Sequence, residues 1–161
     1  MGIAVCTFSL GNGTQWVQRL KEGDQVYFNG PKGKLVYYDG FKNYLFFGDV
    51  STLGRFYGIR RQLGEDQSFY GVFYAERRED LFADIDGTYP FDFITSRRDD
   101  INVQSLFNNC RVFDHSNTVV YVAGEAVFCK GIYKYCSQTL GLNRNQIKAK
   151  PFWHPTKRAL E

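Results

Sequence analysis

From residue 43 to residue 153 short apolar runs alternate with segments of helical spacing, and this alternation constrains the fold more than any other feature. Strand candidates occupy the ranges 43–47, 68–75, 91–95, 118–123 and 147–153. Helix candidates fall between them, at 52–63, 78–83, 101–109 and 125–140. Repeated strand–helix units need right-handed crossovers, which produce a parallel sheet with helices on both faces. We therefore expect an α/β fold with a doubly wound, parallel, five-stranded sheet.

The segment 125–140 has the clearest helical pattern. Its apolar side chains recur at intervals of three and four residues, which places them on one face. Gly141 follows, where a left-handed C-cap residue is expected. Cys129 and Cys136 lie seven residues apart and share that face, so we expect them in the core. Because no CxxC pair occurs and the chain has only 2 histidines, the sequence indicates no metal site.

Composition narrows the classes of protein that the chain can belong to. With 43% apolar and 17% aromatic residues, it is typical of a packed globular protein. The net charge of +3 is mild and its basic residues are scattered among acids, so we expect no nucleic-acid partner, while an anionic small molecule remains possible. No apolar run approaches the roughly 20 residues that span a bilayer, so we expect no membrane partner and a cytoplasmic location.

The first 34 residues have a different character from the rest. They contain an apolar run, the turn GNGT, the helix-like QWVQRL, the turn KEGD and the apolar QVYFNG. Short strands joined by turns predict a piece of antiparallel β-structure. We place a boundary between residues 34 and 43 and assign 1–36 and 37–161 to separate units. Because the chain begins inside a strand pattern and ends in RALE, we expect it to be a fragment of a longer protein.

The stretch FFGDVST follows the first strand of the predicted sheet. In doubly wound sheets a ligand binds at the carboxyl ends of the strands, where the strand order reverses, normally after the first strand. Gly48 would let the backbone turn sharply there. Ser51 or Thr52 would direct a hydroxyl and free helix amides toward an anion such as phosphate. Either residue could instead serve only as an N-cap, and the stretch matches neither GxGxxG nor a P-loop.

Two further stretches end strands at the same edge. In FDFITSRRDD a strand ends in Thr95, Ser96, Arg97 and Arg98, which would place a hydroxyl and a guanidinium at this edge. These groups are suited to a bidentate grip on a phosphate, although a solvated charged turn explains them equally well. VVYVAGEAVF delivers Ala123, Gly124 and Glu125 to the edge. Small residues there would let a flat ring lie close to the backbone, although tight strand-to-helix packing also explains Gly124. Glu125 could cap the following helix or face the ligand.

Together these stretches resemble the pyridine-nucleotide half of the ferredoxin reductase family, and within it the siderophore-interacting proteins, which are flavin-dependent ferric-siderophore reductases. The likeness covers nearly all of the chain and depends on GD followed by hydroxyl residues, on VAGE, and on the ending LGLNRNQIKAKPFWHP. It implies three groups of nucleotide-binding residues: Gly48, Asp49, Ser51 and Thr52 for the phosphates, Ser96 and Arg97 for the 2′-phosphate of NADPH, and Ala123, Gly124 and Glu125 for the nicotinamide.

The resemblance also assigns the first unit. GNGTQWVQRLKEGDQVYFNGPKGK would be the last part of an FAD-binding barrel, with Gly13 and Thr14 at the flavin pyrophosphate. The earlier barrel strands are missing, so we expect this fragment to bind flavin poorly and to be inactive by itself. Phe152 or Trp153 could be the family's terminal aromatic that stacks on the flavin, or could fill the sheet. Glu76, at the end of the second strand, would favour NADH, whereas the serine–arginine pair favours NADPH, the cofactor that we expect.

The implied function is an NAD(P)H-dependent flavin oxidoreductase that passes hydride to FAD and then electrons to a ferric siderophore. Because the cofactors carry the chemistry, we expect no catalytic acid or base. Lys148, Lys150, Lys157 and Arg158 could attract an anionic iron chelate, although surface solubility is the simpler explanation. Two alternatives remain: a ferredoxin- or flavin-type reductase with another acceptor, and a non-redox module that binds a nucleotide or a protein.

Overall fold

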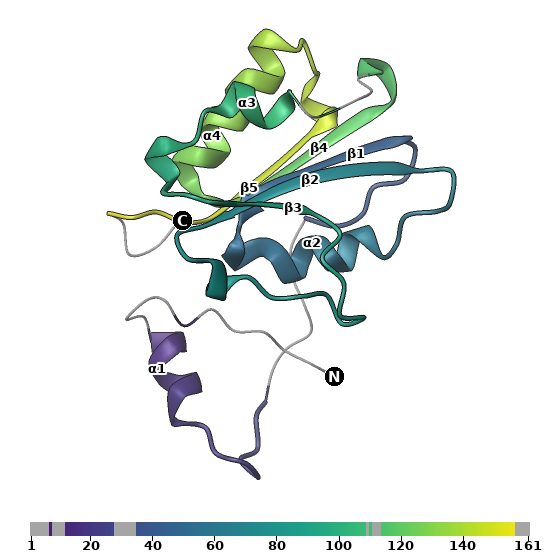
Figure 1. Ribbon diagram of the computed structural model, residues 1–161. Coiled ribbons are helices and arrows are strands. Elements are labelled where there is room, and N and C mark those ends of the chain that lie inside the picture. The colour runs from purple at the N-terminus through teal and green to yellow at the C-terminus, as the bar shows by residue number, and fades with distance from the viewer. Residues whose placement is uncertain (1–6, 8–11, 28–34, 109, 111–113, 157–161) are drawn as a thin grey trace. The chain divides into compact units, whose positions relative to one another are not determined.

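The computed structural model describes residues 7, 12–27, 35–108, 110 and 114–156. The chain divides into two compact units, residues 1–34 and 35–161. In the first unit, α1 (Asn12–Arg19) precedes a turn in which the Asp24 amide donates to the Lys21 carbonyl, 3.1 Å away (Figure 1). This helix and this turn were predicted. The expected strands fall largely outside the described residues, and residues 25–27 form no strand. The assignment of this unit to a flavin-binding barrel stays a prediction.

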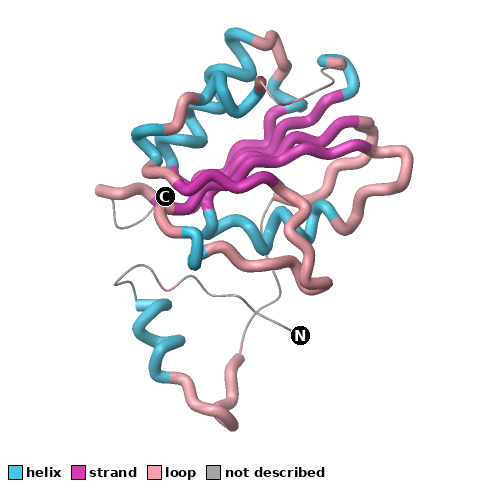
Figure 2. Tube along the Cα trace, in the orientation of Figure 1, coloured by secondary structure: helices cyan, strands magenta, loops and turns pink. Residues whose placement is uncertain are grey.

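The second unit contains one parallel sheet, with the strand order β3-β2-β1-β4-β5 (Figures 1 and 2). Its strands are β1 (Asn43–Asp49), β2 (Ser68–Ala75), β3 (Asp92–Thr95), β4 (Thr118–Glu125) and β5 (Ile147–Trp153). Because β1 pairs with β2 on one side and with β4 on the other, the strand order reverses between β1 and β4. The predicted doubly wound α/β fold is confirmed.

Helices cover both faces of this sheet. α2 (Leu53–Arg60) lies on one face, and α3 (Val103–Phe107) and α4 (Ala126–Lys134) lie on the other (Figure 1). α4 continues through a π-helical turn, and Gly141 then adopts the expected positive φ of +68°. Among the residues that the structure describes, no helix has the length and apolar character needed to cross a bilayer.

The helix expected at 78–83 is wrong. Only one 3-10 turn forms there, Arg78–Asp80, and Leu81 returns to extended backbone with ψ of 138°. The loop that follows is held from the side by α2, because the Tyr57 hydroxyl donates to the Phe82 carbonyl at 2.7 Å. A helix of six residues has little stability of its own, so this tertiary contact decides the local conformation.

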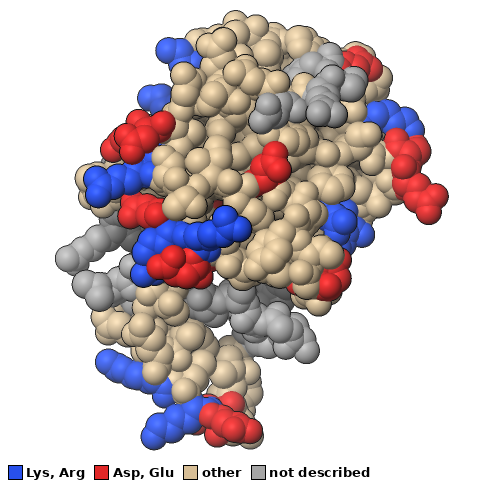
Figure 3. Space-filling model, viewed as in Figure 1, with Lys and Arg blue, Asp and Glu red and all other residues tan. Residues whose placement is uncertain are grey.

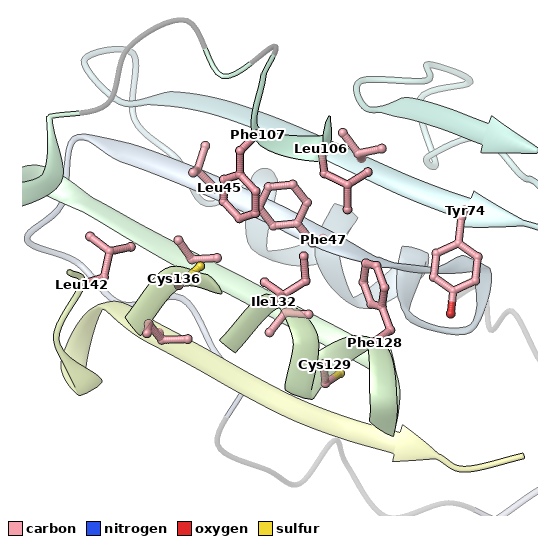
Figure 4. Packing of buried hydrophobic residues seen from close by; sticks show 14 residues of the cluster. Leu45, Phe47, Tyr74, Leu106, Phe107, Phe128, Cys129, Ile132, Cys136 and Leu142 are labelled. Carbon is pink, nitrogen blue, oxygen red and sulfur yellow. The ribbon is translucent and has the colours of Figure 1, made fainter. Parts of the chain in front are cut away.

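Side chains alternate between the two faces of the buried strands, as a sheet covered on both sides requires. Leu45 and Phe47 of β1 pack toward α4, whereas Tyr44 and Phe46 of the same strand pack toward α2. Cys129 and Cys136 lie in the core on the α4 side, as predicted (Figure 4). Burial raises the pKa of both thiols to about 12, so both are un-ionised.

Candidate functional site at the carboxyl edge of the sheet

The carboxyl ends of all five strands meet at one edge of the second unit. Each strand places a polar or aromatic side chain there, and we call these five residues the carboxyl-edge row. In strand order the row consists of Arg98 (just after β3), Tyr74 (β2), Asp49 (β1), Glu125 (β4) and Trp153 (β5). The reversal of strand order lies between Asp49 and Glu125, where doubly wound sheets bind their ligands. The row therefore marks the candidate site.

Asp49 is the centre of the row. It is 3% exposed, and its carboxylate accepts four hydrogen bonds. Oδ1 accepts from the Ser51 amide (2.9 Å) and from the Ser51 hydroxyl, while Oδ2 accepts from the Glu125 amide (2.8 Å) and the Trp153 indole Nε1 (2.9 Å). Burial raises the pKa of this carboxyl, and the hydrogen bonds oppose that shift. One buried carboxylate thus joins the ends of β1, β4 and β5.

Gly124 is the residue that makes room for this carboxylate. Its φ is +115°, and a Cβ at this position would lie 2.6 Å from Cγ and 3.1 Å from Oδ1 of Asp49. The space beside Gly124 is therefore filled by Asp49. This is a third reason for a glycine, beyond the two that the sequence suggests. Gly48 is also confined, since its Cβ would stand 3.0 Å from the Ala123 carbonyl oxygen.

Glu125 caps α4, one of the two roles expected for it. The residue is 1% exposed, and its side chain accepts from the amides of Val127 (2.9 Å) and Phe128 (2.7 Å). A carboxylate at this end of a helix is stabilised by the helix dipole. The Arg98 Nε also lies 3.7 Å from Glu125 Oε2, so the turn after β3 reaches the start of α4.

The turn after β1 uses its own donors internally. The Ser51 amide and hydroxyl both donate to Asp49, which caps the 3-10 turn Val50–Thr52. Thr52 is buried, and its hydroxyl donates to the Asp49 carbonyl at 2.8 Å. A phosphate at this turn would have to replace these bonds and approach a buried carboxylate. The phosphate role of Gly48, Asp49, Ser51 and Thr52 stays a prediction.

The turn after β3 places its two arginines differently. Arg97 is exposed at the edge, whereas Arg98 is half-buried and turns toward Glu125. The Ser96 amide donates to the Ala75 carbonyl at 3.0 Å, and its hydroxyl donates to the Arg97 carbonyl at 3.1 Å. The structure thus brings Arg98 into the row, whereas the family resemblance implied binding roles only for Ser96 and Arg97 of this turn. Arg97 and Arg98 look equivalent in the sequence, and only the backbone path of the turn decides that Arg98 faces Glu125 while Arg97 is exposed.

Tyr74 carries an unused hydrogen-bond donor. The residue is 6% exposed, and within the described part of the chain its hydroxyl has no hydrogen-bond partner. Its ring meets Phe128 edge-on, with 5.0 Å between the ring centroids (Figure 4). Burial, then the charges of Asp49 and Glu125, raise the pKa of Tyr74, so the hydroxyl stays protonated. An unpaired buried donor is costly, which makes this hydroxyl a candidate ligand contact.

The remaining expected residues lie as follows. Gly13 and Thr14 lie in the first turn of α1, and Glu76 is exposed directly after β2. Phe152 and Trp153 are 43% and 42% exposed, so neither fills the sheet.

The four basic residues near the end of the chain differ in their surroundings. Lys148 places its Nζ 3.7 Å from the centroid of the Tyr38 ring, and Lys150 is exposed. Lys157 and Arg158 lie outside the described residues.

Charges of opposite sign lie next to one another on the face that Figure 3 shows. Lys and Arg are interspersed with Asp and Glu there, without a broad area of one sign. Recognition of a charged ligand on this face would therefore depend on individual groups rather than on a long-range field.

Comparison with known proteins places this fold and this edge in a family. The family model of siderophore-interacting proteins matches residues 41–156, a range that includes the whole carboxyl-edge row. The chain belongs to the siderophore-interacting protein family. The resemblance seen in the sequence is confirmed.

Solved structures of the family share the fold. The chain is 16% identical to the siderophore-interacting protein SipS from Aeromonas hydrophila, with a TM-score of 0.71 over 89% of this chain and 62% of that one. A siderophore utilization protein from T. fusca is 17% identical, with a TM-score of 0.69 over 98% of this chain and 61% of that one. The chain thus spans about three fifths of the length of these two proteins.

A more distant structure has the same architecture. The ferredoxin reductase in carbazole 1,9a-dioxygenase gives a TM-score of 0.52 at 15% identity, over 72% of this chain and 37% of that one. A comparison with curated protein sequences found no match. At these identities the solved structures establish the fold, while the roles of individual residues must be argued from the site itself.

Proposed function

We propose that this chain carries the nucleotide-binding part of an NAD(P)H-dependent flavin oxidoreductase that reduces a ferric siderophore. The observation that supports this most is the carboxyl-edge row, which lies where the strand order reverses in a chain of the siderophore-interacting family. Residues 37–161 would form the NAD(P)-binding domain, and residues 1–36 would complete an FAD-binding barrel. By itself the chain would be inactive.

The residues of the edge fit a nicotinamide nucleotide in three respects. Arg97 offers an exposed guanidinium for a phosphate, as the 2′-phosphate of NADPH requires, with Ser96 beside it. Tyr74 offers a buried hydroxyl that needs an acceptor. Trp153 offers a half-exposed aromatic ring next to the β4 end, where Ala123, Gly124 and Glu125 would seat the nicotinamide.

The cofactors would supply the redox chemistry: hydride from NAD(P)H, its acceptance by FAD, and delivery of electrons to the iron complex. This chain's residues would bind and orient. Gly13 and Thr14 would hold the flavin pyrophosphate, and the hydroxyl and glycine residues after β1 would border the nucleotide phosphates. Fixing two reactants at contact distance is what a protein contributes to such a transfer, so we assign no acid or base.

Calorimetric titration of this chain with 2′,5′-ADP and with 5′-AMP tests the nucleotide site. We expect tighter binding of 2′,5′-ADP, and we expect Arg97→Ala to weaken it by about tenfold or more, because a charge-assisted hydrogen bond is lost. Arg144→Ala is the matched control, since it removes an exposed arginine at the start of β5, the opposite edge. Preference for 5′-AMP would reassign the cofactor to NADH, and binding of neither would contradict the nucleotide site.

The fold likeness to a ferredoxin reductase keeps a second acceptor class open. An assay on the chain joined to the FAD-binding barrel strands that the proposal requires distinguishes the two candidates. A ferric-siderophore reductase should form Fe(II), trapped by a chromogenic chelator, when given NADPH and a ferric siderophore. A reductase for ferredoxin or free flavin should instead reduce those acceptors faster. A colourless complete protein that takes up no added FAD would favour a non-redox binding module.

A further inference from the structure

Trp153 at the end of β5 makes an unusual contact across a neighbouring strand. Its Nε1 donates to Oδ2 of Asp49 at 2.9 Å, although Asp49 is on β1 and β4 lies between β1 and β5. Gly124 of β4 leaves the space that the carboxylate needs. The N–H edge of the indole therefore points inward, while 42% of the residue's surface stays exposed.

The acceptor of this bond is held firmly. Besides the indole, Asp49 accepts from the Glu125 amide and from two donors of Ser51, and these bonds hold its carboxylate in place. The hydrogen bond to this carboxylate restricts the orientation of the exposed indole ring. A fixed aromatic face at the surface loses little conformational entropy when a flat ring stacks on it.

The carboxylate that accepts from this indole favours a cation on the exposed face of the ring. Asp49 accepts from Nε1, and Glu125, whose backbone pairs with Trp153, is a second buried carboxylate at the ends of these strands. Arg98 lies 3.7 Å from Glu125. Arg98 also contacts the carboxylate of Asp99, so its charge is shared. Tryptophan is the aromatic side chain that attracts cations most strongly through its face. In the same row, the buried Tyr74 hydroxyl has no partner within the described residues, which itself points to a ligand.

We propose that Trp153, oriented by Asp49, is the surface on which the positively charged nicotinamide ring of the oxidised nucleotide stacks. This inference rests on the proposed function and adds a preference to it: the chain binds the oxidised nucleotide more tightly than the reduced one. The oxidised ring is a planar cation and the reduced ring is neutral, so two ligands of nearly the same shape differ in charge. Asp49 acts through the indole and is a positioning residue.

The test uses the full chain with Trp16→Phe, which leaves Trp153 as the only tryptophan of the 2 in the sequence. Oxidised nicotinamide mononucleotide is the probe, because it lacks the adenosine half. We expect it to quench Trp153 fluorescence saturably, and calorimetry to show about tenfold weaker binding of the reduced mononucleotide. Trp153→Phe keeps an aromatic ring but removes the indole N–H, and should abolish most of this preference.

Asp49→Asn tests the positioning. It should lower the affinity for the oxidised probe by about tenfold and raise the mobility of the indole, seen as lower fluorescence anisotropy in short-time decay. Glu76→Gln is the matched control: it removes one negative charge from an exposed position at the same edge and should change neither quantity. If Asn at position 49 prevents folding, the indole N–H signal in the nuclear magnetic resonance spectrum of the Trp16→Phe protein decides, since a held N–H exchanges slowly with water.

Failure of this inference is distinct from failure of the proposed function. If 2′,5′-ADP binds but the oxidised probe leaves Trp153 fluorescence unchanged, the inference is overturned and the nucleotide site stands. Rapid exchange of the indole N–H, or Asp49→Asn that folds and binds like the control, overturns the role of Asp49. If neither 2′,5′-ADP nor the mononucleotide binds, both proposals are overturned.

Discussion

Replacing Gly124 with alanine should be one of the most damaging single-methyl additions in this protein. The backbone there has φ of +115°, a conformation that costs an L-residue about 1–2 kcal/mol. The new Cβ would also stand 2.6 Å from Cγ of Asp49, so the carboxylate must move. Its displacement leaves the Glu125 amide and the Trp153 indole without their acceptor, and losing a bond of this kind costs about 1–3 kcal/mol. We expect the free energy of unfolding to fall by about 4 kcal/mol in total.

Gly40→Ala is the matched control, because Gly40 has φ of +96° and no atom lies within 4 Å of the place that its added methyl would take. It should lose only the strain energy, about 1–2 kcal/mol. Urea unfolding followed by far-ultraviolet circular dichroism measures both variants. In Asp49→Ala protein the carboxylate is gone, so adding Gly124→Ala should then cost no more than the control. Equal losses for Gly124→Ala and Gly40→Ala in the otherwise unchanged protein would refute the claim that Asp49 fills this space.

Three other perturbations test separate parts of the structure. Tyr74→Phe removes a buried hydroxyl without a described partner, so thermal unfolding should show equal or higher stability while calorimetry shows weaker nucleotide binding; a clear loss of stability would reveal a bond inside the protein. Because burial raises the pKa of Asp49, the folded state holds this proton more strongly than the unfolded state. The stabilisation by the protonated Asp49 side chain is therefore present at low pH and lost as the pH rises through the folded-state pKa. Urea titrations between pH 4 and 7 should show the free energy of unfolding falling with pH in the unchanged protein, and this fall should be absent in Asp49→Asn. Arg61→Ala leaves Asp84, whose side chain is 1% exposed, with the Ile85 amide at 2.7 Å and with Arg60, 4.0 Å away, as its remaining ion-pair partner. This substitution should cost about 2–3 kcal/mol in urea unfolding, whereas Arg144→Ala should cost almost nothing.

The strands were largely predictable because their signal is local. The expected ranges 68–75 and 147–153 coincide with β2 and β5. β2 is a nearly continuous apolar and aromatic run, and β5 begins with Ile147 and ends in the aromatic pair Phe152 and Trp153, residue types that favour extended backbone. β1 extends two residues beyond its expected end, through Gly48 and Asp49. These residue types are typical of turns, yet they pair with β2 on one side, and Gly48 pairs with β4 on the other. The helix expected at 78–83 failed for the opposite reason, because contacts from α2 hold that segment as a loop.

Placement of the candidate site at the carboxyl edge also followed from the sequence. In a doubly wound sheet the ends of parallel strands must meet, so any residue that follows a strand lies at that edge. The stretches around Asp49, Arg97 and Glu125 were selected on this ground. Tyr74 was not, because its position in an apolar run is typical of a core residue. Its unused hydroxyl became visible only when its neighbours were known.

The amino-acid sequence by itself thus determined the fold class, the family and the edge proposed as the candidate site, since each depends on periodicity or on short motifs within one segment. The tertiary structure alone decided what those residues do to each other. Asp49 lies 76 residues from Glu125 and 104 residues from Trp153, and no local pattern connects them. Only the folded sheet brings the three together, because the reversal of strand order places β1, β4 and β5 side by side and a glycine leaves room for one carboxylate between them.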